Sequence, residues 1–145
     1  MPTRPVRAVI KNQDCVTVSA HTHIRRVAEL MKRHHTSAVL VTDTRHKRLL
    51  GICTERDIVF GVVATGHDPA IVTVEEIMTT DPQTISSDRP FGHALHLMYE
   101  GGFRHIPVVD DGHPVGILSA KDALGLDALQ FESELVRREE IAVIL

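Results

Sequence analysis

The chain contains GICTERD at residues 51–57 and GILSAKD at residues 116–122, two short segments with the same pattern. In each one a glycine begins a short apolar run, a hydroxyl residue follows, and an aspartate stands three positions after the hydroxyl. The similarity extends upstream at an offset of 67 residues, which aligns Asp43 with Asp110. The offset falls to 65 at the two segments because the turn before the first of them is two residues longer. A glycine, a hydroxyl and an aspartate that recur across a change in loop length indicate an internal repeat.

Hydrophobic periodicity predicts the same order of elements in both repeats. One helix is expected to begin near His23, and its counterpart follows Pro90, which suits the first helical position. The apolar faces of these helices consist of Ile24, Val27, Ala28, Leu30 and Met31, and of Phe91, Ala94, Leu95, Leu97 and Met98. Two short strands follow each helix, at residues 38–42 and 49–53 and at residues 105–109 and 115–118. A second helix opens at Thr54 or Ser119, so each unit reads strand, helix, strand, strand, helix, and the fold class is α+β.

The repeats divide the chain into four parts. These are a first repeat at residues 10–65, a linker at residues 66–74, a second repeat at residues 75–125 and a C-terminal helix or tail at residues 126–145. Residues 6–10 are expected to add a strand. Because units of about 45–55 residues are small for independent cores, we expect the two repeats to share one core.

Composition excludes several classes of protein. The 145 residues include 16 Lys and Arg against 19 Asp and Glu, a formal net charge of −3, and only 3% aromatic residues. This balance argues against nucleic-acid binding, which uses basic surfaces and base stacking. The longest apolar stretch, residues 58–64, is far shorter than the roughly 20 residues of a membrane-spanning helix. The first residues lack the apolar core of a secretion signal, and Cys15 and Cys53 fit reduced, half-buried thiols, so we expect a soluble, cytoplasmic protein.

The two repeated segments have two explanations that do not exclude each other. Thr54 with Asp57, and Ser119 with Asp122, have the spacing of a capping box, in which a hydroxyl and a carboxylate accept hydrogen bonds from unpaired N–H groups. A turn from a strand into a helix also presents free N–H groups to an anion such as a phosphate. An aspartate there can accept hydrogen bonds from ribose hydroxyls. The spacing alone leaves structural capping and nucleotide binding both open.

Two repeats of this length and pattern resemble a pair of cystathionine-β-synthase (CBS) domains, the tandem arrangement called a Bateman module. The likeness is strongest in FRHIPVVDDG at residues 103–112 and MTTDP at residues 78–82, and it covers about residues 10–125. The resemblance implies two β-α-β-β-α repeats packed with pseudo-twofold symmetry, a regulatory rather than catalytic role, and a homodimer that signals to an unknown effector protein. It also implies two clefts for adenosine-bearing ligands such as AMP, ADP, ATP, NAD(H) or S-adenosylmethionine, with no cofactor required.

The resemblance also implies roles for residues of this chain. Asp57 and Asp122 are expected to bind ribose hydroxyls, and Thr54 and Ser119 to contact phosphate. Because the family's clefts take the first strand of the opposite repeat, the residues expected around the Asp57 cleft are Thr84, Ile85, Ile52, Ile106 and Pro107. Those expected around the Asp122 cleft are Thr17, Val18, Val39 and Ile117. His105 is a further candidate ligand-binding residue, and the candidate phosphate partners are Arg56, Arg104 and Lys121, since charge-assisted hydrogen bonds are the stronger kind.

The two clefts are not expected to be equal. Leu40 stands where the second repeat has Pro107, and Ser37 stands where it has Arg104, so we expect them to differ in affinity or ligand preference. One alternative is an interaction scaffold with empty clefts, in which the repeated turns are only helix caps. A more distant alternative is a nucleic-acid-binding module.

Metal binding and catalysis find little support in the sequence. The pairs His34-His35 and His93 with His96 invite a metal, but structural zinc sites need four convergent ligands that usually include Cys. The chain holds no Gly-x-Ser-x-Gly, His-Glu-x-x-His or Gly-x-x-x-x-Gly-Lys-Ser/Thr motif. Cys53 has no evident base beside it, so its expected role is packing. We therefore expect neither a metal site nor an enzyme.

Overall fold

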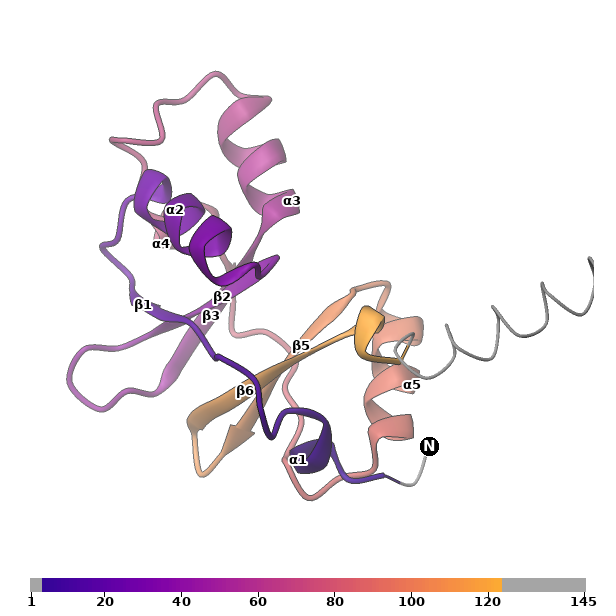
Figure 1. Ribbon diagram of the computed structural model, residues 1–145. Coiled ribbons are helices and arrows are strands. Elements are labelled where there is room, and N and C mark those ends of the chain that lie inside the picture. The colour runs from indigo at the N-terminus through magenta and orange to yellow at the C-terminus, as the bar shows by residue number, and fades with distance from the viewer. Residues whose placement is uncertain (1–3, 124–145) are drawn as a thin grey trace, which may run out of the picture.

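The computed structural model describes residues 4–123, so the expected C-terminal helix or tail at residues 126–145 lies outside the described part of the chain. Figure 1 shows two units side by side, one built on β1, β2, β3, α2 and α4 and the other on β5, β6, α5 and α1. Each unit combines helices with paired strands. The fold is α+β, with two repeats related by pseudo-twofold symmetry.

The first unit is built on a four-stranded sheet in the order β1-β2-β3-β4. Its strands are β1 (Thr17–Ser19), β2 (Ala38–Thr42), β3 (Leu49–Thr54) and β4 (Thr79–Thr80). β1 runs parallel to β2, whereas the pairs β2–β3 and β3–β4 are antiparallel. All five residues of β2 are buried, as the continuous apolar run of a central strand requires. β4 comes from the second half of the chain, so the sheet already joins the two repeats.

The second unit is built on a two-stranded antiparallel sheet of β5 (His105–Asp110) and β6 (His113–Ser119). Ile85 forms a parallel bridge with Val108, and the equivalent pair in the first repeat, at the offset of 67 residues, is Val18 with Val41. The strand-pairing register shifts after Val41 in one repeat and after Val108 in the other. The irregularities are therefore repeated along with the regular elements, which confirms the internal repeat.

The long helices α2 (Ile24–His34) and α5 (Phe91–Gly101) end in the same way. The residues that follow them, His35 and Gly102, both have left-handed backbones, with φ of 50° and 70°. A left-handed residue directly after a helix satisfies its last carbonyl groups and turns the chain toward the next strand. After β3 the chain continues through α3 (Glu55–Ile58) into the π-helical segment η1 (Val59–Val63).

The N-terminal segment is a helix, α1 (Val6–Val9), and the prediction of a strand at residues 6–10 is wrong. Val6 and Ile10 are four positions apart and only 0% and 8% exposed, so a helical backbone places both against the core of the second repeat. The counterpart of α1 is α4 (Val74–Ile77), which packs on the first repeat. Each repeat is thus completed by a short helix that comes before the other repeat.

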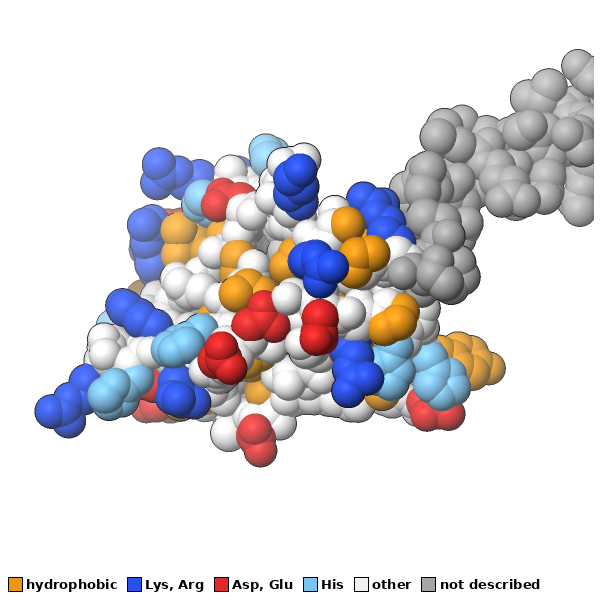
Figure 2. All heavy atoms as spheres, turned by 90° about the horizontal axis from the view of Figure 1, so that it is seen from below, with side chains coloured by type: hydrophobic (Ala, Val, Ile, Leu, Met, Phe, Trp, Pro, Cys, Tyr) orange, Lys and Arg blue, Asp and Glu red, His pale blue; other side chains and the backbone are white. Residues whose placement is uncertain are grey.

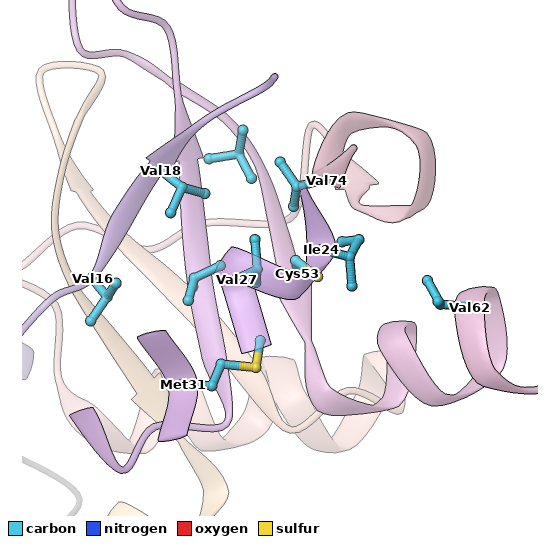
Figure 3. Close-up of a cluster of buried hydrophobic side chains, with 10 residues drawn as sticks. Val16, Val18, Ile24, Val27, Met31, Cys53, Val62 and Val74 are labelled. Carbon is cyan, nitrogen blue, oxygen red and sulfur yellow. The ribbon is translucent and has the colours of Figure 1, made fainter. Parts of the chain in front are cut away.

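The core consists of three clusters of buried side chains. Figure 3 shows the first, which lies between α2, the sheet of the first repeat and α4. The second surrounds Phe91 in the other repeat. The third joins Ala38, Leu40 and Ile52 of the first repeat to Ile117 of the second. Each repeat therefore has a core cluster of its own, and the expectation of one shared core holds only for this third cluster, which belongs to both halves.

Candidate functional site

A cavity of about 1040 Å³ lies between the two repeats and is lined by both repeated turns. The first turn, from β3 into α3, contributes Thr54 and Asp57, and the second, after β6, contributes Ser119 and Lys121. Pockets for small ligands commonly measure about 300–1,000 Å³ and often lie between structural units. The cavity is therefore large enough for a nucleotide and draws on the segments that the sequence singles out.

The turn at Thr54 is a complete capping box. The backbone N–H of Asp57 donates to Thr54 Oγ1 at 3.3 Å, and Asp57 Oδ2 accepts from Thr54 N at 2.9 Å and from Thr54 Oγ1 at 3.1 Å. Both of these bonds to the carboxylate end on the same oxygen. No hydrogen bond from the described residues reaches Asp57 Oδ1, so capping leaves one carboxylate oxygen available at the cavity wall.

The turn at Ser119 has related but not identical geometry. Asp122 Oδ2 accepts from Ser119 N at 2.7 Å, and Ser119 Oγ accepts from Lys121 N at 3.2 Å. A backbone hydrogen bond fixes each turn to the segment before the central strand, from Glu55 N to Ser37 O at 3.0 Å and from Ala120 N to Arg104 O at 2.9 Å. The two turns are thus placed alike, while Asp122 lies outside the residues that line the cavity.

His105 connects the two repeats inside this cavity. Its Nε2 lies 2.7 Å from Ser37 Oγ, across the boundary between the halves of the chain. Burial lowers the pKa of His105, and the positive charges of Lys121 and Arg104 lower it further, against the opposing effect of Glu55 and Asp122. The imidazole is therefore neutral at pH 7 and joins the repeats by an uncharged hydrogen bond.

The cavity wall carries more positive than negative side chains. Arg56, Arg104 and Lys121 line it together with the carboxylates of Glu55 and Asp57. The Arg56 guanidinium lies over the Phe60 ring, 5.0 Å from its centre, a cation–π contact. Among residues 4–123, none of the three cations takes part in an ion pair. Their charge is available to an anionic ligand.

The structure brings together part of the predicted set of site residues. Those that line the cavity are Ile52, Thr54, Arg56, Asp57, Arg104, His105, Ser119 and Lys121. Those outside its lining are Thr17, Val18, Val39, Thr84, Ile85, Ile106, Pro107, Ile117 and Asp122. Burial explains much of this division, because Val18 and Val39 belong to the first core cluster and Ile85 and Ile106 to the second. Contact between these outer residues and a ligand stays a prediction.

The first strand of each repeat pairs within its own repeat. Thr17 lies opposite Leu40 on β2, and Ile85 lies opposite Val108 on β5. The segment that crosses to the opposite sheet is the one just before Thr84, where Thr79 pairs with Ile52. This pairing explains why Thr79 and the nearby Pro82 and Gln83 line the cavity in place of Thr84 and Ile85.

Sequence reasoning missed several lining residues. Besides Thr79, Pro82 and Gln83, they are Ser37, Glu55, Gly102, Phe103 and Ala120. The MTTDP segment at residues 78–82 carried a signal for the first group, since it is one of the two stretches with the clearest family likeness. The remaining residues are neighbours of predicted ones and follow from the packing of the two turns.

Cys53 is a core residue. Its side chain is fully buried in the first cluster, and burial, together with the negative charge of Asp57, raises the pKa of its thiol to about 12. A thiol with such a pKa stays protonated and is a poor nucleophile. The expectation that Cys53 serves packing is confirmed.

Two further findings apply to the described residues. No three or more His, Cys, Asp or Glu side chains gather within residues 4–123 in a way that could hold a metal ion. Over the same residues no helix has both the length and the apolar character needed to cross a membrane.

Comparison with known proteins identifies the family. The model of the CBS domain matches the chain twice, at residues 6–64 and 74–128. An uncharacterized protein of Methanopyrus kandleri is 31% identical over 119 residues, which cover 81% of this chain and 60% of that protein. The chain spans 17–62% of the length of eight curated relatives that it matches.

Solved structures agree with the family match. A CBS-domain-containing protein of Agrobacterium tumefaciens is 31% identical, with a TM-score of 0.76 over 86% of this chain and 99% of that one. The CBS domain pair of the protein MJ0100, solved with methylthioadenosine and S-adenosyl-L-methionine, is 28% identical, with a TM-score of 0.78 over 89% and 99% of the two chains. With two matches to the family model, two repeats related by pseudo-twofold symmetry and relatives over most of its length, this chain belongs to the CBS domain family as a tandem pair of CBS domains, a regulatory module.

Proposed function

We propose that this CBS domain pair binds an adenosine-bearing ligand in the cavity between its repeats and signals the presence of that ligand to a partner protein. AMP, ADP, ATP, NAD(H) and S-adenosylmethionine are the candidates. The observation that supports this proposal best is that both repeated turns, Thr54–Asp57 and the one at Ser119, line one cavity of nucleotide size.

The lining offers a partner for each part of such a ligand. Asp57 Oδ1, which capping leaves free, can accept a hydrogen bond from a ribose hydroxyl. Ile52, Pro82 and Phe103 provide apolar surface for an adenine ring. Arg104 and Lys121 lie on the opposite repeat and suit a phosphate. A ligand held in this way contacts both repeats at once.

A relative supports the ligand class. The CBS domain pair of MJ0100 shares this fold at 28% identity and was solved with two adenosine derivatives. We propose that this chain binds a ligand of the same class, an adenosine derivative. The differences among the lining residues of this chain decide which adenosine derivative fits.

Signalling follows from the position of the cavity. A ligand that binds one arrangement of the repeats more tightly than another shifts the population toward it. We further propose that the module is a cytoplasmic homodimer without catalytic activity and that it acts on an effector protein. Val59, Phe60 and Val63 are 48%, 58% and 70% exposed on η1, which provides apolar surface for a second subunit.

A nucleic-acid partner has less support. In Figure 2 the face seen from below carries acidic side chains among the basic ones, with no continuous basic stripe. A nucleic-acid-binding surface is typically a basic patch or stripe. The mixed charge of this face fits the net charge of −3.

A calorimetric titration with AMP, ATP, NADH and S-adenosylmethionine tests the proposed function. We expect at least one ligand to bind, and we expect Asp57→Asn to weaken it about tenfold or more because a hydrogen bond to a charged acceptor is lost. Asp111→Asn is the matched control, since Asp111 is exposed in the turn between β5 and β6 and does not line the cavity. Its expected change is less than about threefold, because surface substitutions away from a site have small effects.

Two results would contradict the proposal. Absence of binding for all four ligands at millimolar concentration would favour a scaffold whose turns are only caps, and recovery of a partner protein that is indifferent to nucleotide would support that alternative. Equal weakening by both aspartate variants would remove the assignment of Asp57. Melting temperatures of the two variants without ligand show whether either one fails to fold.

A further inference from the structure

His105 occupies the place in the cavity where a side chain of one repeat is hydrogen-bonded to a side chain of the other. It projects from β5, and its Nε2 meets Ser37 Oγ, which precedes β2. His105 and Ser37 both line the cavity. A ligand in the cavity therefore lies against the contact that joins the two repeats.

Charged groups surround this histidine from three directions. Arg104 directly precedes His105, just before β5 begins. Lys121 and Asp122 approach from the helical residues 120–123, and Glu55 approaches from the start of α3. Lys121, Arg104 and Glu55 line the cavity, whereas Asp122 is outside its lining and accepts from Ser119 N. The cations on the cavity side therefore act on His105 without an ion-pair partner among the described residues.

We propose that, when the phosphate of an adenosine ligand binds at Arg104 and Lys121, its binding is coupled to the protonation of His105, which lines the same cavity and joins the repeats through Ser37. The inference rests on the proposed function and names the regulation of the same site. It distinguishes phosphorylated adenosine ligands from the uncharged nucleoside and from the sulfonium cation of S-adenosylmethionine.

The coupling follows from electrostatics. Without ligand, burial and the charges of Lys121 and Arg104 lower the pKa of His105 and keep it neutral. A phosphate at Lys121 and Arg104 compensates these charges and adds a negative charge nearby, which favours the imidazolium form. The protonated ring keeps its bond to Ser37, because a hydroxyl oxygen accepts from Nε2–H, and it gains the strength of a charge-assisted donor. Ligand binding then strengthens the hydrogen bond between His105 and Ser37 that joins the repeats.

Calorimetry at pH 7.5 in two buffers of different ionisation enthalpy measures this coupling directly. AMP is the probe, with adenosine as the ligand that lacks a phosphate, and at this pH the phosphate of AMP is already almost fully ionised because its second pKa is about 6. We expect proton uptake with AMP and none with adenosine. We also expect AMP affinity to rise toward the limit of about tenfold per pH unit as the pH falls from about 8 to 7.

His105→Gln is expected to abolish the proton uptake with AMP, whereas His93→Gln, on an exposed part of α5, is expected to preserve it. Nuclear magnetic resonance titration of the His105 ring in the unsubstituted protein, with and without AMP, is the second measurement. It does not depend on the stability of a variant. The expected result is a higher pKa of His105 in the complex.

The outcomes separate this inference from the proposed function. If neither AMP nor adenosine binds, the proposed function fails. If AMP binds without proton uptake, if adenosine gives the same uptake, or if the pKa of His105 is unchanged in the complex, the proposed function stands and this inference is overturned.

Discussion

The side chain of Gln13 forms, in the second repeat, the backbone hydrogen bonds that a neighbouring strand forms in the first repeat. Gln13 Nε2 donates to the carbonyl of Ile117 at 2.5 Å, and Ile117 N donates to Gln13 Oε1 at 2.6 Å. In the first repeat the equivalent residue, Ile52, pairs with the backbone of Thr79 on β4. One side-chain amide thus takes the place of a strand beside β6, and the sheets of the two repeats differ in their number of strands.

Gln13→Ala is expected to destabilise the protein by about 2 kcal/mol, because it leaves both backbone groups of the buried Ile117 without their partner. Urea unfolding measures this loss. Gln83→Ala, a change at an exposed glutamine with no hydrogen bond in the described part of the chain, is the control and is expected to stay within about 0.5 kcal/mol of the parent protein. Equal unfolding midpoints for the two variants would contradict the role of Gln13.

At the residue scale, the sequence predicts contacts between residues that stand only a few positions apart along the chain. Thr54 and Asp57 stand three positions apart, so the spacing of these two residues is enough to predict their capping box. Gln13 and Ile117 are 104 positions apart, and no local pattern relates them. Their contact arises only because α1 and the segment after it pack against the second repeat.

At the scale of elements, β3 and β4 approach so closely that only glycine fits between them at residue 51. A Cβ on Gly51 would lie 2.7 Å from the carbonyl oxygen of Thr79 and 2.6 Å from Met78 Sδ. The equivalent glycine, Gly116, is covered by Ile10, with a Cβ distance of 2.8 Å to its Cδ1. The repeated glycine therefore marks the position where each sheet receives the crossing segment of the other repeat.

Gly51→Ala is expected to cost about 2 kcal/mol, because the added methyl group pushes β4 away from β3. The comparison is Gly61→Ala on η1, where a Cβ would lie 3.1 Å from Ile77 Cγ2, a looser contact than those at Gly51, and where alanine suits a helix better than glycine. We expect that variant to stay within about 1 kcal/mol of the parent, as the helix preference of alanine offsets the tight contact. Thermal unfolding of both variants measures the difference, and a similar loss for the two would argue against close strand packing at residue 51.

The elements themselves were largely predictable, for physical reasons. The periodicities of α2, α5, β2 and β5 extend over enough residues to distinguish a helix from a strand. α1 has only four residues, and its Val-Arg-Ala-Val sequence suits either form. Its helical form is decided by tertiary contacts, such as the bond from Val6 N to the carbonyl of Arg89.

At the scale of the whole molecule, the short helix that comes before each repeat packs on the other repeat: α1 packs on the second repeat and α4 on the first. Ile24 N donates to the carbonyl of Val72, and at the equivalent position Phe91 N donates to the carbonyl of Arg4, at 2.9 and 2.7 Å. The packing partner of each short helix could not be predicted from the sequence. The repeat pattern shows that two repeats exist, but it does not show on which of them a flanking segment packs. This packing also explains the site, since Thr79, Pro82 and Gln83 reach the cavity only along the crossing segment.

Because His105 joins the two repeats, its titration couples pH to the stability of the whole molecule. In the folded protein, burial and the charges of Lys121 and Arg104 hold the pKa of His105 below its usual value of about 6.5, to which it returns on unfolding. Between the folded and unfolded pKa values the unfolded state therefore binds more protons. The contribution of His105 to the free energy of unfolding therefore falls as the pH drops below about 6.5, by at most about 1.4 kcal/mol per pH unit for one proton.

His105→Gln removes this titration, so we expect its free energy of unfolding to fall less steeply than that of the parent protein between about pH 6.5 and 5. Urea unfolding at several pH values, without nucleotide, measures the two slopes. His93→Gln lies on an exposed face of α5 and is expected to keep the parent slope. Parallel slopes for the parent and His105→Gln would mean that the pKa of His105 is the same in the folded and unfolded states, and its titration would then not be coupled to stability.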